Sequence, residues 1–588
     1  MQFNEVAHAF LEIEKEASRV KMTEYLAQLF KKATPEEARI IAYLSLGLLR
    51  AVYEGTQFNF AAKSLVPVVA SLLEISEQEV GRRSVLAGDL GAVISEGTWV
   101  ASDNLSLTSV FEQLQNFASM SGSGSVDEKM SVLVDLLRAL DPLSARYIVR
   151  ILLGKLRLGF SEMTLIDALS WMLAGDKSLR ALLEYAFNVS ADIGLIAQTA
   201  REGGVSAVER IGIVLGVPIR PAAAERLPSA TAVIEKIGEA IAQPKFDGFR
   251  LQVHIDRRTE VPKITFFSRN LLPMTTMFPD LYKALKDLHV ETAVIEGEAL
   301  AVDEVTGTYL PFQETVKRRR KYDIAAMVEE LPLKLMLFDL LYLDGVSWLD
   351  KTQQERYIQL KKMFSDYGNR SVAVTDQIVV HTAQELEAYF LSSITAGLEG
   401  VMVKRPDSLY QPGKRNFSWI KLKRSERGKL DDTIDAVVLG YYNGEGKRAL
   451  FGIGAFLVGV YNKNEDRFET IAKIGTGLTD FGWRELRAKC DELKIAEQPH
   501  NVVVARDLAP DVWVTPELMV VIRADEITRS PIHSAGKRSD ALGYALRFPR
   551  FLEYRFDKSP TEATDVEEIT SLFEQQKMVE SENALNIV

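Results

Sequence analysis

Lys245 is the residue whose surroundings most directly suggest covalent chemistry. It lies in the sequence PKFDGFR (244–250), directly ahead of the strand-like run 251–255. An unprotonated lysine amine can attack the α-phosphorus of a nucleotide and hold the nucleotide as a phosphoramidate. A free lysine has a pKa of about 10.4, so such a nucleophile needs burial or neighbouring positive charge. The alternative is an ordinary turn at the edge of a strand.

Carboxylates recur in two later β-like runs. Glu296 and Glu298 share one face of the run 293–302, because side chains alternate along a strand. Glu399 begins the next such run, EGVMVK (399–404). Mg²⁺ takes few protein ligands, so carboxylates from two strands would suit an ion that serves a triphosphate. Each glutamate alone is more often a salt-bridge partner than a metal ligand.

Two lysines in WIKLK (419–423) suggest an anion site. Alternation directs Ile420 and Leu422 into a core and Lys421 and Lys423 to the opposite face. Like charges on one face repel each other, and a bound triphosphate would relieve the repulsion. A strand that faces solvent is the simpler alternative.

Other segments could complete a nucleotide site. Phe338 offers an aromatic face for a base, although core packing is the default for such a residue. The segment SRN (268–270) contains Arg269, which could reach a ribose or a phosphate. Near the end, RFPR (547–550) and RFDK (555–558) form a cationic group that could orient a pyrophosphate leaving group.

The elements around these residues predict three parts. Residues 1–212 repeat apolar residues at three and four spacing and predict an all-α domain. Residues 213–429 alternate short β-branched runs with helical stretches, which predicts an α+β domain of antiparallel character. Residues 430–588 contain short strands joined by glycine-rich turns and predict a small β-barrel, followed by a C-terminal tail.

Composition excludes several classes of protein. The chain has 588 residues, 47% of them hydrophobic, and one cysteine, Cys490, which rules out a disulfide framework or a four-cysteine zinc module. The N-terminus reads as an amphipathic helix and the longest apolar run is short, so we expect a soluble, intracellular protein with no membrane partner. A net charge of −11 argues only weakly against nucleic acid, because binding surfaces are local. Seven basic residues and one acidic residue lie between positions 414 and 429.

In order, these motifs resemble the ATP-dependent DNA ligases, in particular the archaeal and eukaryotic replicative type with an N-terminal helical DNA-binding domain. The motifs are KFDGFR (245–250), SRN (268–270), EGE (296–298), PFQ (311–313), FDLLYLDG (338–345), EGVMVKRP (399–406), GKR (413–415), WIKLK (419–423) and RFPRF…RFDK (547–558). One such motif is weak evidence, whereas nine in order are specific. The resemblance implies an adenylation (nucleotidyltransferase) domain at 213–429 and an OB-fold domain at 430–588.

The resemblance also implies roles for single residues. Lys245 would be the adenylated nucleophile, and Phe338 would stack on adenine. Arg250 and Arg269 would contact the ribose and phosphates, Glu298 the ribose or a metal, and Glu399 a metal. Arg415, Lys421 and Lys423 would bind phosphates, while Arg547, Arg550, Asp557 and Lys558 would close over ATP from the OB domain in the first step. Gln243 would face the base, at a position where the family usually has glutamate. The choice of nucleotide is therefore the property in which this chain is most expected to differ from the family.

What the chain would do follows from the same resemblance. ATP and Mg²⁺ (or Mn²⁺) would be the cofactors, and nicked duplex DNA would be the partner of a monomer that is cytoplasmic, at the nucleoid, or otherwise intracellular. No clear sliding-clamp peptide stands out. An RNA ligase or a capping-type nucleotidyltransferase would use the same lysine, but neither needs roughly 210 helical residues ahead of it. A DNA-binding scaffold with a degenerate site would form no covalent nucleotide.

Overall fold

The chain forms two compact units in a computed structural model. The first comprises Met1–Val68 and Thr98–Arg424, and the second comprises Val69–Gly97 and Ser425–Val588. The structure describes residues 1–55, 58, 60, 62–122, 124–227, 229–303, 309–310, 315, 317–318, 324–423, 433–538, 541–556 and 558–585. The motif at 311–313 and Asp557 therefore lie outside the described residues.

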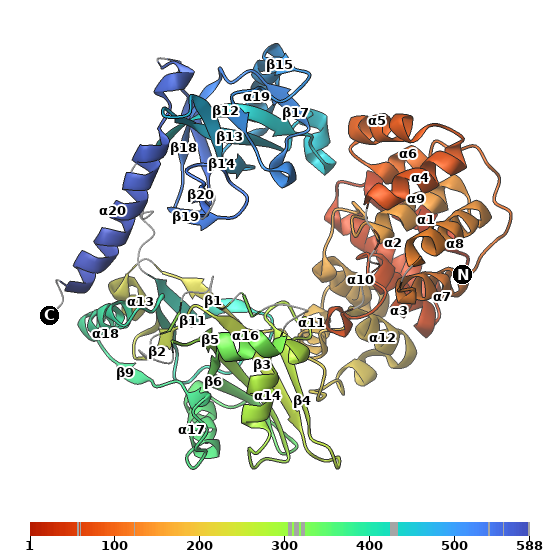
Figure 1. Ribbon diagram of the computed structural model, residues 1–588. Helices are drawn as coiled ribbons and strands as arrows, with labels where there is room; N and C mark the ends of the chain where they lie inside the picture. The colour runs from red at the N-terminus through yellow and green to blue at the C-terminus, as the bar shows by residue number, and fades with distance from the viewer. Residues whose placement is uncertain are drawn as a thin grey trace. The chain divides into compact units, whose positions relative to one another are not determined.

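The N-terminal segment is helical, as predicted. Its described residues up to 222 contain helices and one isolated bridge, between Gln2 and Ser106, but no strand. The helices are α1 (Phe3–Lys15), α2 (Arg19–Lys32), α3 (Pro35–Leu44), η1 (Val52–Glu54), α4 (Ala62–Leu73), α5 (Glu77–Ala87), α6 (Leu90–Ile94), α7 (Leu107–Ser119), α8 (Ser125–Ala139), α9 (Pro142–Leu152), α10 (Glu162–Ala174), α11 (Arg180–Ser190) and α12 (Ile193–Val208) (Figure 1).

Caps and apolar stripes explain these helices. Thr34 caps α3 by accepting from the Glu37 N–H, and Glu37 reaches back to the Thr34 N–H, which satisfies two otherwise unpaired donors. Helix α1 buries one apolar stripe, consisting of Phe3, Val6, Ala7, Phe10 and Ile13. Beside this stripe, Glu14 forms ion pairs with Arg146 and Arg150 of α9 at 2.6 and 2.7 Å.

The central part of the first unit contains a five-stranded sheet. Its strand order is β1 (Ala223–Arg226), β11 (Arg415–Lys423), β10 (Gly400–Lys404), β2 (Ala240–Lys245) and β9 (Ile378–Val380). Helices α13 (Ala230–Ile237) and α18 (Ala383–Thr395) cover one face, where alternate residues such as Ala242, Val401 and Leu422 share one apolar cluster. By alternation, Lys245, Lys421 and Lys423 occupy the opposite face.

A second sheet lies against that opposite face. Its order is β4 (Lys263–Ser268), β3 (Phe249–Asp256), β5 (Thr292–Ala301), β6 (Leu333–Leu343) and β7 (Val346–Ser347), and β8 (Val372–Val374) pairs with β6. Phe338 and Leu341 of this sheet pack in one cluster with Met402 and Trp419 of the first sheet, so the two sheets face each other. Helices η2 (Thr275–Met277), α14 (Pro279–Leu285), α16 (Ile324–Glu330) and α17 (Gln353–Met363) complete this part (Figure 1).

The second unit is rich in strands, as predicted. One eight-stranded sheet contains β12 (Ile434–Tyr442), β13 (Ala455–Asn462), β14 (Arg467–Ile474), β15 (Lys494–Ile495), β16 (Val502–Val503), β17 (Val512–Val514), β18 (Met519–Arg523) and β21 (Arg550–Tyr554). A two-stranded sheet contains β19 (Glu526–Ser530) and β20 (Gly543–Arg547). The helices of its C-terminal stretch are η3 (Gly446–Phe451), α19 (Asp480–Glu492), η4 (Arg506–Leu508), η5 (Pro560–Glu562) and α20 (Val566–Leu585), and its N-terminal stretch Val69–Gly97 contains the end of α4 together with α5 and α6.

The predicted fold class, helical then α+β then strand-rich, is confirmed. Strand pairing among the described residues does not close the eight-stranded sheet, so the closed barrel stays a prediction. The domain boundaries at 212 and 429 also stay predictions.

Candidate active site

Lys245 is the last residue of β2 and contacts a carboxylate that directly precedes the neighbouring strand β10. Its Nζ forms an ion pair with Glu399, and Lys423 of β11 forms an ion pair with the other oxygen of the same carboxylate. Burial would raise the pKa of Glu399, but the two lysines outweigh burial and hold that pKa below its usual value. The register aligns Gly400 with both Lys245 and Lys423, so these three strands meet at one point.

A group of cations surrounds this point. Burial lowers the pKa of Lys421, and the charges of Lys423, Arg415, Lys245 and Arg269 lower it further. Among the described residues, Lys421, Arg269 and Arg415 have no ion-pair partner. The structure therefore brings five predicted phosphate or nucleophile residues together around Lys421, and Glu399 pairs with two of them, which leaves positive charge suited to an anion.

Glu298 supplies a second carboxylate from the facing sheet. It accepts a hydrogen bond from the Gly248 N–H at 3.2 Å. Burial raises its pKa to about 7, against the opposing influence of Lys245 and Arg250. A side chain at position 248 would place its Cβ 2.4 Å from the Ala299 carbonyl oxygen, so only glycine allows this close approach.

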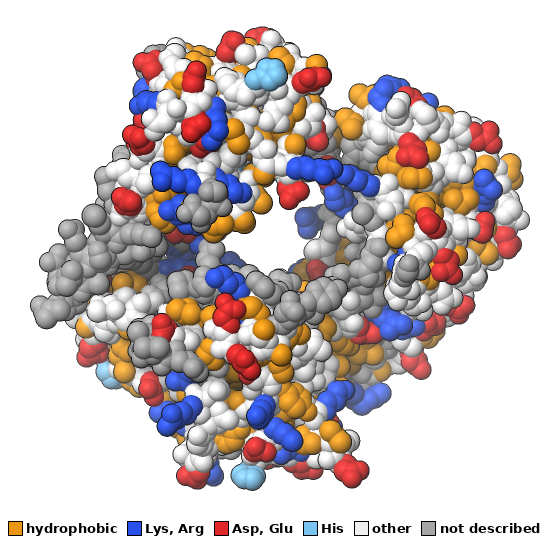
Figure 2. Space-filling view, in the orientation of Figure 1, with side chains coloured by type: hydrophobic (Ala, Val, Ile, Leu, Met, Phe, Trp, Pro, Cys, Tyr) orange, Lys and Arg blue, Asp and Glu red, His pale blue; other side chains and the backbone are white. Residues whose placement is uncertain are grey.

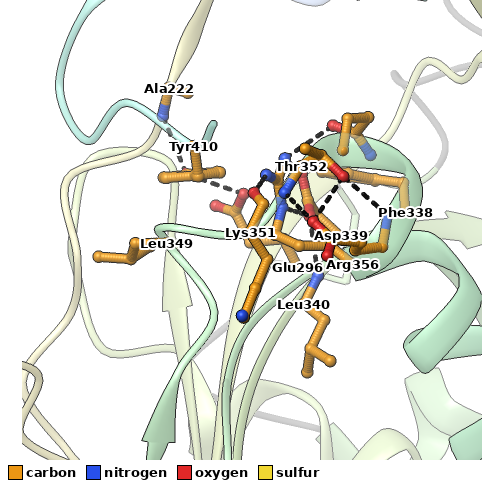
Figure 3. A network of polar contacts seen from close by, with 12 residues as sticks. Ala222, Glu296, Phe338, Asp339, Leu340, Leu349, Lys351, Thr352, Arg356 and Tyr410 are labelled. Atoms are coloured by element: carbon orange, nitrogen blue, oxygen red, sulfur yellow. Dashed lines mark hydrogen bonds and ion pairs between the residues drawn. The ribbon is translucent and has the colours of Figure 1, made fainter. Parts of the chain in front are cut away.

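Arg250 and Glu296 form a buried pair. Arg250 contacts the Glu296 carboxylate at 2.9 Å and donates to the Ala222 carbonyl at 2.8 Å. Tyr410 donates to Glu296 at 3.0 Å, and its hydroxyl accepts from the Ala222 N–H at 3.0 Å (Figure 3). The guanidinium also lies 5.5 Å from the Phe338 ring. Glu296 is thus a salt-bridge partner, and Arg250 is already engaged by protein groups.

Phe338 lies above a polar network that sequence reasoning missed. Asp339 pairs with Arg356 of α17 at 2.7 Å, and both side chains are fully buried (Figure 3). The Lys404 ammonium donates to the Phe338 carbonyl at 3.3 Å and lies 5.1 Å from its ring. Burial lowers the pKa of Lys404 to about 8. The only signal for this network was the lysine in EGVMVKRP, which alternation places on the same face as Met402.

Gln243 faces the same space as Lys245, because the two residues are two positions apart on β2. Its side chain is buried and donates to the Gln377 amide oxygen at 3.2 Å. Its register partner is Met402, which packs in the cluster of Phe338 and Trp419.

The predicted cationic residues of the second unit are paired within that unit. Arg547 pairs with Glu526 at 2.6 Å, Lys558 pairs with Asp435 at 2.6 Å, and Arg550 forms an ion pair with Asp525. Figure 2 shows Lys and Arg side chains gathered near β19 and β20. Their closure over a nucleotide stays a prediction.

Two features are absent from the described part of the chain. It contains no group of three or more His, Cys, Asp and Glu side chains arranged to hold a metal ion. It also contains no helix with the length and apolar character needed to cross a membrane.

Comparison with known proteins identifies this architecture. The central fold, with its lysine between two facing sheets, is of the nucleotidyltransferase type. Three families match in order: "DNA ligase N terminus" over residues 2–170, "ATP dependent DNA ligase domain" over 221–423 and "ATP dependent DNA ligase C terminal region" over 450–558. The chain belongs to the ATP-dependent DNA ligases.

Full-length relatives support the assignment. A "Probable DNA ligase" of Dictyoglomus thermophilum is 45% identical over 98% of both chains. "DNA ligase 2" of Thermofilum pendens is 37% identical over 98% of both chains. The solved structure "Pmar-Lig_PreS3" shares the fold, with a TM-score of 0.55 and 17% identity over 94% of this chain and 99% of that one.

Proposed function

We propose that this chain seals nicks in duplex DNA, between a 3′-hydroxyl and a 5′-phosphate, at the expense of ATP. The observation that supports this most strongly is the group of cations that act on Lys421 and that includes the nucleophile: Lys245, Arg269, Arg415 and Lys423. A phosphate chain held by these cations would bring its α-phosphorus to the lysine amine. Catalysis of phosphoryl transfer rests mainly on such positioning and charge stabilisation.

Three in-line displacements make up the proposed reaction. Lys245 Nζ forms a bond to the α-phosphorus of ATP, the bond to the β-phosphate oxygen breaks, and pyrophosphate leaves. The 5′-phosphate of the nick then displaces the lysine and takes the AMP. Finally the 3′-hydroxyl attacks the 5′-phosphorus, AMP departs and the strand is sealed.

The two carboxylates fit a divalent cation. Glu298 and Glu399 would hold Mg²⁺ or Mn²⁺ together with phosphate oxygens and water, because Mg²⁺ takes few protein ligands. Such an ion would neutralise charge that develops on the phosphates. Glu298 has no cation in direct contact among the described residues, so its partly buried carboxyl is open to that role. Glu399 pairs with Lys245 in the resting chain and cannot serve the lysine and a cation fully at once.

The remaining proposed roles follow from position. Phe338 would carry the adenine, Gln243 would face its edge, and Arg250 would reach the ribose from its pair with Glu296. Arg547, Arg550, Asp557 and Lys558 would act from the second unit in the first step. We further propose three domains, 1–212, 213–429 and 430–588, and an intracellular monomer bound to DNA.

Covalent labelling tests the first step. The protein incubated with α-labelled ATP and Mg²⁺ should acquire an acid-labile label, as expected of a phosphoramidate, and Lys245→Ala should abolish it. Lys283→Ala, an exposed lysine of α14, is the matched control and should label normally. Persistent labelling of Lys245→Ala would refute the assignment of the nucleophile.

Nick sealing tests the whole reaction. The wild-type protein should seal a nicked DNA duplex with ATP but not with NAD. Lys245→Ala should bind the same duplex and leave it open. Labelling without sealing of DNA, but with joining of RNA ends, would support the RNA ligase alternative instead.

A further inference from the structure

Gln243 places a buried amide beside the nucleophile. The residue is 1% exposed and lies on the sheet face that meets the second sheet, two residues before Lys245. The amide nitrogen donates to the Gln377 oxygen at 3.2 Å. Gln377 directly precedes β9, whose first residue aligns with Ala242 of β2, so the two amides are neighbours across this ladder.

The surroundings of Gln243 suit a flat aromatic ligand. Met402 lies opposite Gln243 in the strand register. Met402 also packs in the cluster that contains Phe338 and Trp419. The cations Arg250 and Lys404 also lie over the Phe338 and Trp419 rings. Such an apolar and aromatic wall can bind a planar heterocycle, and the uncharged amide of Gln243 beside it can read the edge of the base.

The chemistry of an amide decides which heterocycle fits. Adenine presents an amino donor at N6 beside an acceptor at N1, whereas guanine presents a carbonyl acceptor at O6 beside a donor at N1. A glutamine amide has one donating and one accepting end of nearly equal size, so a half-turn of the amide matches either edge. A carboxylate only accepts, so it matches the adenine amino group and repels the guanine carbonyl.

Gln377 allows both orientations of the Gln243 amide, with either its nitrogen or its oxygen toward position 377. We call these two orientations its settings. If Gln243 turns, its oxygen faces Gln377, and a half-turn of the Gln377 amide then presents a donor to it. The hydrogen bond between the two amides is therefore kept in both settings, and neither leaves a buried polar group without a partner. A carboxylate at position 377 would hold Gln243 in one setting only.

We propose that the Gln243–Gln377 amide pair lets this chain use GTP as well as ATP as its nucleotide donor. The inference rests on the proposed function of Lys245 and extends it to a second purine nucleotide. In the reaction with GTP, Lys245 Nζ bonds to the α-phosphorus and loses a proton to solvent. The bond between the α-phosphorus and the β-phosphate oxygen breaks, and pyrophosphate leaves with its electron pair.

Self-labelling of the full-length protein tests the proposal. We would measure kcat/KM for label transfer from α-labelled ATP and α-labelled GTP in separate reactions with Mg²⁺. The wild-type GTP/ATP ratio should be about 0.1 and in any case at least 0.01. Gln243→Glu should lower this ratio at least tenfold. Gln377→Glu should also lower it, because a carboxylate at position 377 would keep the Gln243 nitrogen pointed toward it and leave only the accepting oxygen for the base.

The controls separate the possible failures. Gln354→Glu makes the same change on the exposed side of α17 and should leave the ratio unchanged. A wild-type ratio below 0.01, or a ratio unaltered in both Gln243→Glu and Gln377→Glu, would overturn the proposal while labelling by ATP persists. No label from either nucleotide would instead refute the proposed function. If Gln243→Glu does not fold, the Gln377→Glu ratio decides alone.

Discussion

At the scale of single residues, the site is defined by an imbalance of charge. Lys245 and Lys423 share Glu399, while Lys421, Arg269 and Arg415 have no ion-pair partner among the described residues. Like charges this close raise the free energy of the empty site, and a bound anion lowers it. The same arrangement that binds phosphates is therefore unfavourable for the unliganded protein.

Substitution of Lys421 by methionine should separate binding from stability. Loss of one charge-assisted contact costs about 1.5–3 kcal/mol, so KM for ATP in self-labelling should rise about 10- to 100-fold. The thermal midpoint of the nucleotide-free protein should not fall, because a repulsive charge has been removed. Lys283→Met is the control for loss of an exposed lysine. A lower midpoint together with an unchanged KM would show that Lys421 has a structural role only.

At the scale of elements, alternation along strands was the most informative signal. It placed Lys421 and Lys423 on one face and Ile420 and Leu422 in a core, and the structure has both. The period is local, so it could be read from five consecutive residues. The pairing of Arg356 with Asp339 could not be predicted this way, because it joins a helix to a strand and depends on how they pack.

The same limit applies to Arg250 and Glu296. The sequence placed each on a strand face but gave no indication that they would pair with each other, since that depends on the β3–β5 register. The sequence also could not predict the Gln243–Gln377 contact, which depends on the short β9 strand joining the sheet beside β2. The strand face that each side chain occupies was predictable from the sequence, whereas its pairing partner on another strand was not.

The packing of the segment around Gly216 and Ile219 against β3 should weaken in acid. His254 accepts a hydrogen bond at Nδ1 from the Gly216 N–H at 3.2 Å, and its Nε2 lies 2.9 Å from Gln252, which binds both backbone groups of Ile219. Burial lowers the pKa of His254 to about 3 from 6.5. Because the folded-state pKa is depressed, the contribution of neutral His254 to the free energy of unfolding is complete above pH 6.5 and is lost as the pH falls toward 3.

Denaturant unfolding at a series of pH values measures this loss. Between pH 7 and pH 4, the free energy of unfolding of the wild-type protein should fall by about 3 kcal/mol more than that of His254→Asn. The interval from the ordinary histidine pKa of 6.5 down to pH 4 is 2.5 pH units, which corresponds to that free energy. Carboxylates titrate in both proteins and cancel in the comparison. His289→Asn, an exposed histidine, should follow the wild-type curve. Parallel curves for wild type and His254→Asn would contradict the assignment.

At the scale of the whole molecule, net charge is a poor guide to the partner. The chain carries a formal charge of −11, yet Lys and Arg side chains gather locally, as around the nucleophile and near β19 and β20 (Figure 2). Binding to a phosphate backbone releases counterions, and only the local cations take part. An acidic protein can therefore bind DNA with a strong dependence on salt.

The salt dependence of binding to a nicked duplex tests this view. We expect the affinity, measured by fluorescence anisotropy between 50 and 300 mM salt, to fall with a log–log slope of roughly −4 or steeper, which corresponds to at least four or five phosphate contacts. Lys245→Ala should show nearly the same slope, because one lysine contributes at most about one unit. A slope near zero would exclude binding through the phosphate backbone.

The shared carboxylate of Glu399 has a consequence for how the protein exists in a cell. A ligand that binds only the folded form stabilises it by mass action, and a covalently held nucleotide does so without dissociating. Because Glu399 pairs with only two of the cations gathered there, we expect the nucleotide-free chain to be less stable than the chain that carries a lysine-bound nucleotide, and the latter to predominate wherever nucleotide is plentiful. On the proposed reaction, protein isolated from cells should be a mixture of adenylated and nucleotide-free molecules. Pyrophosphate, which reverses the first step, should convert this mixture to a single population with a lower thermal midpoint.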